Sequence, residues 1–321
     1  MLTPEQQAIR GQGIGASEVA AICGLNPYKS ALAVYMDKLN LTERGPETEA
    51  LEWGTRLEDV IASKYAEKAA GEGLRLWRPG VTFRNPERPW MLCTPDGLLL
   101  PAQAEADLAK VDRGLECKTA GYRQAFRWGE ADDAVPEQYL LQCAWSIIVT
   151  KVPRWDLAAL IGGQDYREYV IVRDPDLEAM LIQIVGEFWQ RVLDRKPPEP
   201  DASESAANAL KRIYAKHSGD IIQANEECQS LAFALRETQK VREDAERREL
   251  GLENLLKAII AENAGIEGAF GRITWKRSKD SIRTDWKAVA ETVKAPVEIV
   301  KQHTATQPGS RRFLTAWAKE D

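Results

Sequence analysis

The strongest constraint on the fold is a proline-rich break in this 321-residue chain, at Lys196-Pro197-Pro198-Glu199-Pro200. Proline lacks a backbone N–H and clashes with the preceding helical turn, so neither a helix nor a central strand runs through this stretch. A chain of this length can hold one large domain or two ordinary ones. The break therefore predicts a first domain over 1–196, a linker over 197–205 and a C-terminal extension over 206–321.

Before the break, the hydrophobic pattern alternates between helical and strand-like periods. Helices are predicted over 4–9, 17–23, 30–39 (with Ser30 as N-cap), 48–70 and 175–195, and after Pro136. Strands are predicted over 74–77, 81–84, 90–93, 98–100, 114–118, 155–161 and 167–173. This order predicts an α/β (α+β) fold in which a central mixed β-sheet is flanked by helices.

After the break the pattern changes to one long helix, or two collinear ones, over 219–263, followed by a small β element. Along that helix, apolar residues at a 3–4 spacing are interrupted by Arg248, so both a coiled coil and packing within the chain stay open: Val241, Ala245, Leu252, Leu255 and Ile259. Arg272–Arg277 and Arg311–Trp317 are predicted as two strands around a short helix.

The composition argues against several kinds of site. Only two histidines are present, His217 and His303, too few for a multi-histidine metal cage and badly placed for a Ser-His-Asp triad. The five cysteines stand singly, with no CxxC pair, which is typical of a reduced cytosol and not of a disulfide framework. No apolar run approaches the roughly 20 residues of a membrane span, and no secretory signal is visible. We therefore expect a cytoplasmic protein without membrane association.

Charge is spread unevenly over a chain whose formal net charge is −6. Residues 1–200 carry 23 basic against 30 acidic residues, a net of −7, whereas 271–319 carry 11 against 4, a net of +7. A basic segment permits nucleic-acid binding but is more often a solvated face. Trp275 and Trp286 lie in it, where they either stack on a nucleic-acid strand or belong to an exposed edge.

Three ionisable residues carry the clearest chemical signal. Thr94-Pro95-Asp96-Gly97 is a turn signal between two apolar runs, which would place Asp96 at a hairpin tip. In Glu116-Cys117-Lys118, strand alternation puts Glu116 and Lys118 on one face. Two carboxylates that converge in this way suit Mg²⁺, and a lysine beside them can orient or deprotonate an attacking water. On these residues alone, a solvated turn beside a surface strand is the more common explanation.

Further motifs in the chain favour a catalytic site over a solvated turn beside a surface strand. In fixed order the chain carries Gly13–Glu18, Trp53–Glu58, Pro95–Gly97, Glu116–Lys118 and Gln138–Gln142. Together these resemble the phage YqaJ-type recombinase nucleases, relatives of lambda exonuclease in the PD-(D/E)xK superfamily, over residues 10–175. The resemblance implies a restriction-endonuclease-like nuclease core for the first domain and assigns no role to the long-helix extension.

The resemblance also implies a catalytic set. Asp96, Glu116 and the backbone carbonyl of Cys117 match the metal ligands, and Lys118 matches the catalytic lysine. Glu58 matches a further acidic residue that helps hold the metals, although Thr55-x-x-Glu58 is also a capping-box pattern. Gln142 matches a glutamine that lines the active site. Gln138, one turn earlier, is the weaker candidate. Two Mg²⁺ ions per site are implied, with Mn²⁺ as a substitute.

Arg10 and Ser17 match, at the same seven-residue separation, the pair that holds the 5′-phosphate of a DNA end in this family. A guanidinium makes bidentate bonds to phosphate, and a hydroxyl at a helix N-terminus adds a donor where anions are favoured. Ser17 as a simple N-cap and Arg10 as an exposed charge are the structural alternatives.

The function implied by the resemblance is a Mg²⁺-dependent 5′-to-3′ double-strand DNA exonuclease. It releases 5′-mononucleotides and leaves a 3′ single-stranded tail for phage homologous recombination by strand annealing. Double-stranded DNA ends, a phage single-strand annealing protein and a homotrimeric ring are the implied partners, in a bacterial host cell. Two alternatives stay open: a structure-specific or restriction-like endonuclease on the same core, and a non-catalytic DNA-end-binding scaffold.

Overall fold

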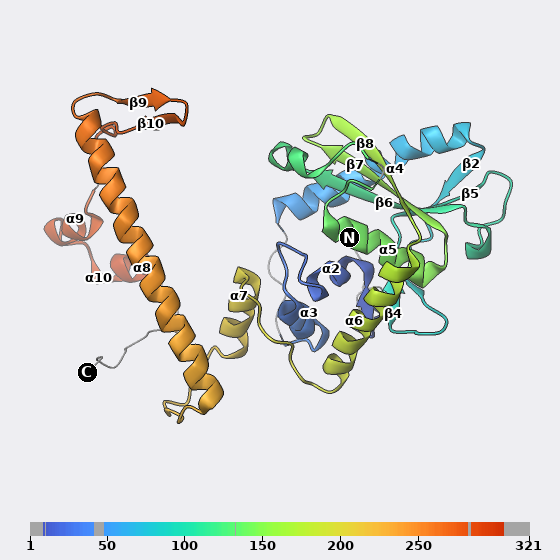
Figure 1. Ribbon diagram of the computed structural model, residues 1–321, viewed down its shortest axis with the longest axis horizontal. Coiled ribbons are helices and arrows are strands. Elements are labelled where there is room, and N and C mark those ends of the chain that lie inside the picture. Colours follow the sequence, from blue (N-terminus) through green and yellow to red (C-terminus); the bar gives the residue numbers. More distant parts are fainter. Residues whose placement is uncertain (1–8, 10, 42–47, 132, 282–283, 305–321) are drawn as a thin grey trace. The chain divides into compact units, whose positions relative to one another are not determined.

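The computed structural model describes residues 9, 11–41, 48–131, 133–281 and 284–304. Backbone contacts divide the chain into two compact units, 1–215 and 216–321 (Figure 1). The proline-rich stretch over 197–205 therefore lies inside the first unit, and the helix that follows it belongs there too. The domain boundaries drawn from the sequence stay predictions, since compactness does not show which segment folds alone.

A five-stranded mixed sheet forms the centre of the first unit, in the order β2-β5-β6-β7-β8. Its strands are β2 (Leu74–Trp77), β5 (Gly97–Pro101), β6 (Arg113–Ala120), β7 (Arg154–Ile161) and β8 (Asp165–Val172). β6 and β7 are parallel, and the other neighbours are antiparallel. The predicted mixed sheet is thus confirmed, with strand positions within two residues of those expected.

A second, three-stranded sheet joins β1 (Ile14–Gly15), β4 (Met91–Cys93) and β3 (Phe83–Arg84), with β1 parallel to β4. β4 and β5 therefore belong to different sheets, and the turn residues 94–96 connect them. The expectation of a hairpin tip at Asp96 was wrong. The turn signal is local, and it does not specify which strands the flanking segments pair with.

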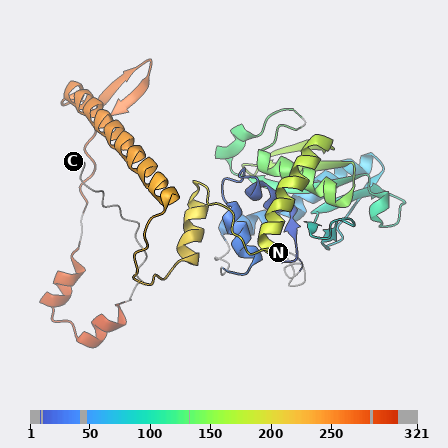
Figure 2. The ribbon, with the colours of Figure 1, turned by 60° about the horizontal axis from the view of Figure 1, so that its bottom comes forward.

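Helices cover both faces of the central sheet (Figures 1 and 2). One face packs on α4 (Glu49–Gly71), with Ile61, Ala62, Tyr65 and Ala69 against Leu99, Leu115, Cys117 and Ala158. The other face joins a larger core with α2 (Val19–Ile22), α3 (Ala31–Lys38), α5 (Glu137–Thr150) and α6 (Pro175–Leu193). Successive strand residues alternate between the two cores, as the period of two requires.

Local signals set the ends of these helices. The Ser30 hydroxyl accepts from Ala33 N, and Thr48 caps α4 by accepting from Leu51 N. α6 starts with Asp174 as its cap and Pro175 in its first turn. Because α4 begins at residue 49, the Thr55-x-x-Glu58 pattern lies inside a helix and caps nothing. The helix predicted over 4–9 falls almost entirely outside the described residues.

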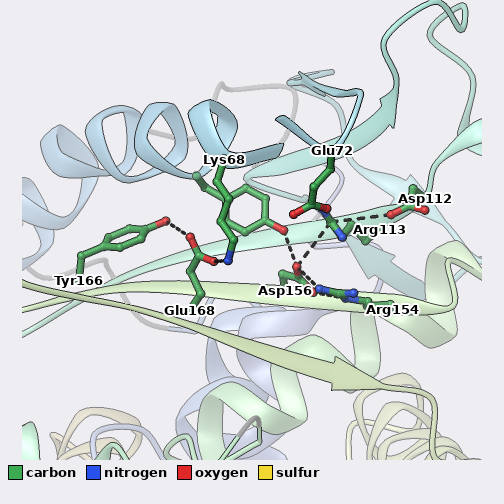
Figure 3. A network of polar contacts seen from close by, with 9 residues as sticks. Lys68, Glu72, Asp112, Arg113, Arg154, Asp156, Tyr166 and Glu168 are labelled. Atoms are coloured by element: carbon green, nitrogen blue, oxygen red, sulfur yellow. Dashed lines mark hydrogen bonds and ion pairs between the residues drawn. The ribbon is translucent and has the colours of Figure 1, made fainter. Parts of the chain in front are cut away.

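A polar network pins α4 to the sheet on the face that carries Cys117 (Figure 3). Asp156 on β7 is 3% exposed and accepts hydrogen bonds from Tyr65 on α4 and from Arg154 Nε at 2.5 Å. Arg113 lies 3.5 Å from the same carboxylate and also pairs with Glu72. Since every buried charge here has a partner, the network orients α4 without leaving an isolated ion.

Short segments complete the first unit. Three are 3₁₀ turns: η1 (Ala16–Glu18), η2 (Leu108–Lys110) and η3 (Tyr122–Arg127). α7 (Glu204–Ile213) is joined to α3 through Ser205 Oγ, which accepts from Ser30 N at 3.0 Å.

The second unit contains α8 (Glu226–Ile260), β9 (Gly265–Gly268), β10 (Gly271–Thr274), α9 (Trp286–Thr292) and α10 (Val297–Gln302). The long helix is confirmed, although it begins later than residue 219. β10 overlaps the strand predicted over Arg272–Arg277, but its partner is β9, which the sequence pattern missed. Arg311–Trp317 lies outside the described residues. No helix in the described ranges combines the length and apolar character that a bilayer crossing requires.

Candidate active site

A cleft of about 640 Å³ opens where β5 separates from β6. The ladder between these strands ends at Gly97 and Leu115, because the chain before Gly97 turns away to the other sheet. The remaining length of β6 therefore has a free edge on this side. Polar residues from both sheets and both helical layers line the cleft: Ser17, Thr55, Glu58, Arg78, Thr94, Asp96, Glu116, Lys118 and Gln142.

At this edge of β6, the Asp96 side chain accepts a backbone hydrogen bond that a neighbouring strand would otherwise accept. Its Oδ2 accepts a hydrogen bond of 2.8 Å from Cys117 N, a donor that the β5 ladder no longer reaches. Burial raises the pKa of Asp96, against the lowering effects of Lys118 and of the Cys117 N–H. The turn thus places a half-buried carboxylate beside Glu116. The sequence pattern also predicted that these two carboxylates converge, but from a hairpin that the structure does not contain.

Glu116 and Lys118 lie on one face of β6, as strand alternation predicted. Lys118 Nζ and Gln142 Nε2 each lie 2.5 Å from Glu116 Oε1, and Glu116 is 3% exposed. Tyr139 on α5 packs its ring 5.2 Å from Lys118 Nζ. One helix, α5, thus supplies both the amide that binds the carboxylate and the ring beneath the ammonium group.

Burial, together with neighbouring charges, shifts the pKa values of the cleft residues. Burial, reinforced by the charge of Asp96, raises the pKa of Glu116 to about 8. Burial also raises the pKa of Glu58, and Asp96 adds to this. Although burial lowers the pKa of Lys118, Glu116 and Asp96 outweigh it and hold that pKa above its usual value. Lys118 therefore stays charged, which suits orienting water or stabilising negative charge rather than abstracting a proton.

Arg78 is a cleft residue that the sequence did not reveal. It follows β2, pairs with Glu58 and Asp59, and donates from Nε to the carbonyl of Asp96 at 2.9 Å. The guanidinium therefore partly neutralises the acidic wall of the cleft. No local pattern distinguishes this arginine from the other surface arginines, because its partners lie about 20 residues away in both directions.

Ser17 also lines the cleft, in the 3₁₀ turn η1 that links β1 to α2. The next residue, Glu18, accepts from Gly15 N at 2.8 Å and pairs with Lys38 Nζ at 2.6 Å, with both side chains buried. Gly13, just before, has no room for a side chain because a Cβ would lie 2.1 Å from the Trp90 carbonyl oxygen. The loop that presents Ser17 is therefore held from both ends.

Of the remaining predicted residues, one stands apart from the cleft and one lies outside the described residues. Gln138 is buried, and its Oε1 accepts from Arg127 at 3.4 Å; it is not among the residues that line the cleft. Arg10 lies outside the described residues, so the predicted phosphate-binding pair is represented by Ser17 alone.

The donor set has the chemistry of a divalent cation site. Glu58, Asp96 and Glu116 line one cleft, and burial raises the pKa of all three by disfavouring their charged forms, which a bound cation would stabilise. Among the described residues, no three His, Cys, Asp or Glu side chains are arranged to hold a metal. Their oxygens instead take Arg78, Lys118, Gln142 and Cys117 N as partners. A cation would have to displace some of these contacts.

Comparison with known proteins shows what this chain is similar to. Residues 5–153 match the sequence model of the YqaJ-like viral recombinase domain. The chain is a homologue of YqaJ, an uncharacterized protein of Bacillus subtilis strain 168, with 29% identity over 226 residues. The match covers 68% of this chain and 66% of the Bacillus protein, slightly less than two thirds of its length.

Shorter and more distant similarities were also found. An African swine fever virus protein is 42% identical over 53 residues, which cover 16% of this chain and 15% of that protein. Among solved structures, an alkaline exonuclease from Laribacter hongkongensis has a TM-score of 0.46 at 18% identity, with 60% of this chain and 94% of that one covered. A phage-related exonuclease from Haemophilus somnus has a TM-score of 0.42 at 11% identity, over 57% of this chain and 96% of the other.

Proposed function

We propose that the chain is a Mg²⁺-dependent double-strand DNA exonuclease that digests from the 5′ end. The observation that carries the proposal is the convergence of Asp96, Glu116 and Lys118 in one cleft of a recombinase domain. Two carboxylates beside a lysine that stays charged match the demands of phosphodiester hydrolysis better than those of a binding scaffold, which needs no such acids in its cleft.

Different residues of the chain have different roles in this hydrolysis. Asp96, Glu116 and Glu58, with the Cys117 carbonyl, are the groups that would hold divalent cations. Bound cations of this kind activate a water and neutralise the charge of the phosphate. Lys118, charged and 2.5 Å from Glu116, orients the attacking water and stabilises the negative charge that develops on phosphorus. Gln142 holds the Glu116 carboxylate in place.

The part of the cleft that contains Ser17 would set the direction of digestion. We infer that its hydroxyl and the Arg10 guanidinium bind a 5′-terminal phosphate, so that the first phosphodiester of that strand reaches Glu116 and Lys118. The products are then 5′-mononucleotides and a 3′ single-stranded tail. The tail is the substrate of a strand-annealing protein, the partner implied for phage homologous recombination.

We also infer that the chain assembles into a homotrimeric ring around DNA, which would make digestion processive. A phage- or prophage-encoded enzyme of this kind acts in the host cytoplasm. Mg²⁺ is the expected metal, two ions per site, with Mn²⁺ able to replace it. Residues 1–196 form the exonuclease domain in this proposal, joined by the 197–205 linker to an extension whose role is open.

The experiment is digestion of a linear duplex with one 5′ end phosphorylated and the other blocked, in Mg²⁺ or in EDTA. A covalently closed circle serves as control. Mononucleotide release from the phosphorylated end only, with the circle intact, supports the exonuclease. Nicking of the circle supports the endonuclease alternative, and DNA binding without cleavage of either substrate supports the scaffold.

A further inference from the structure

The 3₁₀ segment η3 exposes two aromatic side chains directly after the strand that carries Glu116 and Lys118. Tyr122 and Phe126 are 83% and 86% exposed, more than any other large apolar side chain described in the first unit. Burying a large ring is worth about 1.5–3 kcal/mol, so rings left in water on a folded segment indicate a binding surface.

The segment is anchored and does not trail into solvent. Trp128, immediately after η3, is 3% exposed and stacks on Tyr139 with ring centroids 5.5 Å apart. Tyr139 is the ring that lies 5.2 Å from Lys118 Nζ. The η3 segment is therefore connected to the catalytic lysine through two packed rings.

The other end of η3 rests on the turn between β7 and β8 (Figure 1). A Cβ on Gly162 in that turn would lie 3.4 Å from Tyr122 Cβ, so the base of the tyrosine contacts the turn while its ring points into solvent. Gln124 Nε2 also donates to Tyr28 OH at 2.8 Å. Both ends of the segment are thus fixed, which lowers the entropic cost of presenting the rings.

The composition of the segment favours nucleic acid as the occupant. Residues 121–129 read Gly-Tyr-Arg-Gln-Ala-Phe-Arg-Trp-Gly, with two arginines, no acid and no Leu, Ile or Val. Each exposed ring is followed by an arginine, Arg123 or Arg127. Rings stack on bases of any sequence, and guanidinium groups contact the phosphates between those bases.

Tyr122 also lies only four residues after Lys118 along the chain. At about 3.3 Å per residue, Tyr122 lies roughly 13 Å along the chain from Lys118. A strand whose phosphodiester sits at Glu116 and Lys118 therefore reaches η3 within a few nucleotides.

We propose that Tyr122 and Phe126 form a stacking platform for unpaired bases of the DNA strand engaged at the cleft, with Arg123 on its phosphates. This inference rests on the proposed function, because it takes the cleft as the place where DNA is cut. It adds a single-strand contact that favours separation of the duplex end before cleavage.

The test measures DNA binding in EDTA, where cleavage does not occur. The probes are a fluorescein-labelled 20-nucleotide oligothymidylate and a labelled duplex closed by hairpins at both ends. For the double variant Tyr122→Ala/Phe126→Ala, we expect affinity for the single strand to fall roughly tenfold or more, with duplex affinity within about twofold. The matched variant Tyr122→Phe/Phe126→Tyr retains both rings and is expected to bind like the unmodified protein. Unchanged single-strand affinity in the alanine variant overturns the platform.

A second measurement uses the unmodified protein, so that it holds even if the alanine variant does not fold. An oligothymidylate carrying 5-iododeoxyuridine is photocrosslinked, and the adducts are mapped by mass spectrometry. Adducts at Tyr122 or Phe126 support the platform, and adducts confined to other segments overturn it. Light scattering completes the test: a changed oligomeric state with unchanged single-strand affinity means that the rings contact a second copy of the chain, which also overturns it.

Digestion of the linear duplex by the unmodified protein distinguishes a failure of the stacking platform from a failure of the proposed nuclease function. Digestion together with unchanged binding by the alanine variant overturns the platform alone. Absence of digestion, together with a tenfold loss of single-strand binding, overturns the nuclease and leaves a single-strand binding surface.

Discussion

Gln142 on α5 donates a 2.5 Å hydrogen bond to Glu116 on β6, at the same carboxylate oxygen that Lys118 contacts. The helix that covers one face of the sheet thus fixes the orientation of a buried acid within it. Two donors on one oxygen hold an acid whose burial disfavours its charge. This relationship makes the cleft sensitive to a residue that need not contact the substrate.

Replacement of Gln142 by Leu is expected to slow DNA cleavage by about 10- to 100-fold, because hydrogen bonds to charged groups are worth about 1.5–3 kcal/mol. The measurement is the initial rate of mononucleotide release at saturating Mg²⁺. Gln138→Leu is the control, since Gln138 contacts Arg127 and does not line the cleft. Equal losses in the two variants would contradict the role given to Gln142.

Lys118→Ala is expected to lower cleavage at least 100-fold and to leave DNA binding in EDTA within a few-fold of normal. The charged ammonium acts on the reacting phosphate, whereas affinity comes from many phosphate contacts. Lys151→Ala, which removes an exposed lysine paired with Glu87 at 3.6 Å, is the control. Cleavage that survives in the Lys118 variant refutes the catalytic assignment.

Lys38→Met is expected to lower the free energy of unfolding by about 3–5 kcal/mol, because it leaves the buried Glu18 carboxylate without its partner. Urea denaturation provides the measurement. Lys29→Met removes a pair of similar length, Lys29 with Asp37, in which both side chains are partly exposed, and should cost less than about 1 kcal/mol. The double variant Lys38→Met/Glu18→Gln should recover part of the loss, and failure of the first variant to destabilise would contradict the account.

Addition of Mg²⁺ is expected to raise the melting temperature, because a ligand that binds only the folded state stabilises it, by about 2.7 kcal/mol at 100 times its Kd. Asp96→Asn and Glu116→Gln should abolish the shift, since each removes a carboxylate that would hold the cation. Asp165→Asn, outside the cleft, should keep the shift. A metal-independent melting temperature in the unmodified protein would argue against the cation site.

Glu72 in the polar network of Figure 3 makes a pH-dependent contribution to stability. Its hydrogen bond with Arg113 lowers the pKa of Glu72 below the usual 4.5. The folded state therefore binds this proton less readily than the unfolded state, so the contribution is present above pH 4.5 and disappears as the pH falls through the folded pKa. Glu72→Gln should lower the melting temperature at pH 7 and have progressively less effect below pH 4.5. Glu67→Gln, an exposed acid on the same helix, is the control, and a constant difference across this pH range would contradict the prediction.

Much of the fold was predictable because its signals are local. Ser30 caps a helix through a bond three residues away, and β6 places Glu116 and Lys118 on one face through the alternation of any strand. Asp96 was predicted as a site residue, but the predicted hairpin around it was wrong. A turn sequence does not specify which strands pair with one another. The β9–β10 pairing was missed for the same reason.

Spacing along the chain was enough to predict the strands of the central sheet, most of the helices around it and the order of the motifs that resemble YqaJ-type recombinase nucleases. Which side chains meet in the cleft depends on how the chain folds as a whole. Arg78 faces Glu58 across 20 residues of chain, Gln142 reaches Glu116 across 26, and Lys38 buries its charge against Glu18. Such contacts follow from the divergence of β5 from β6 and from the packing of α5, and both are properties of the whole fold that no short segment encodes.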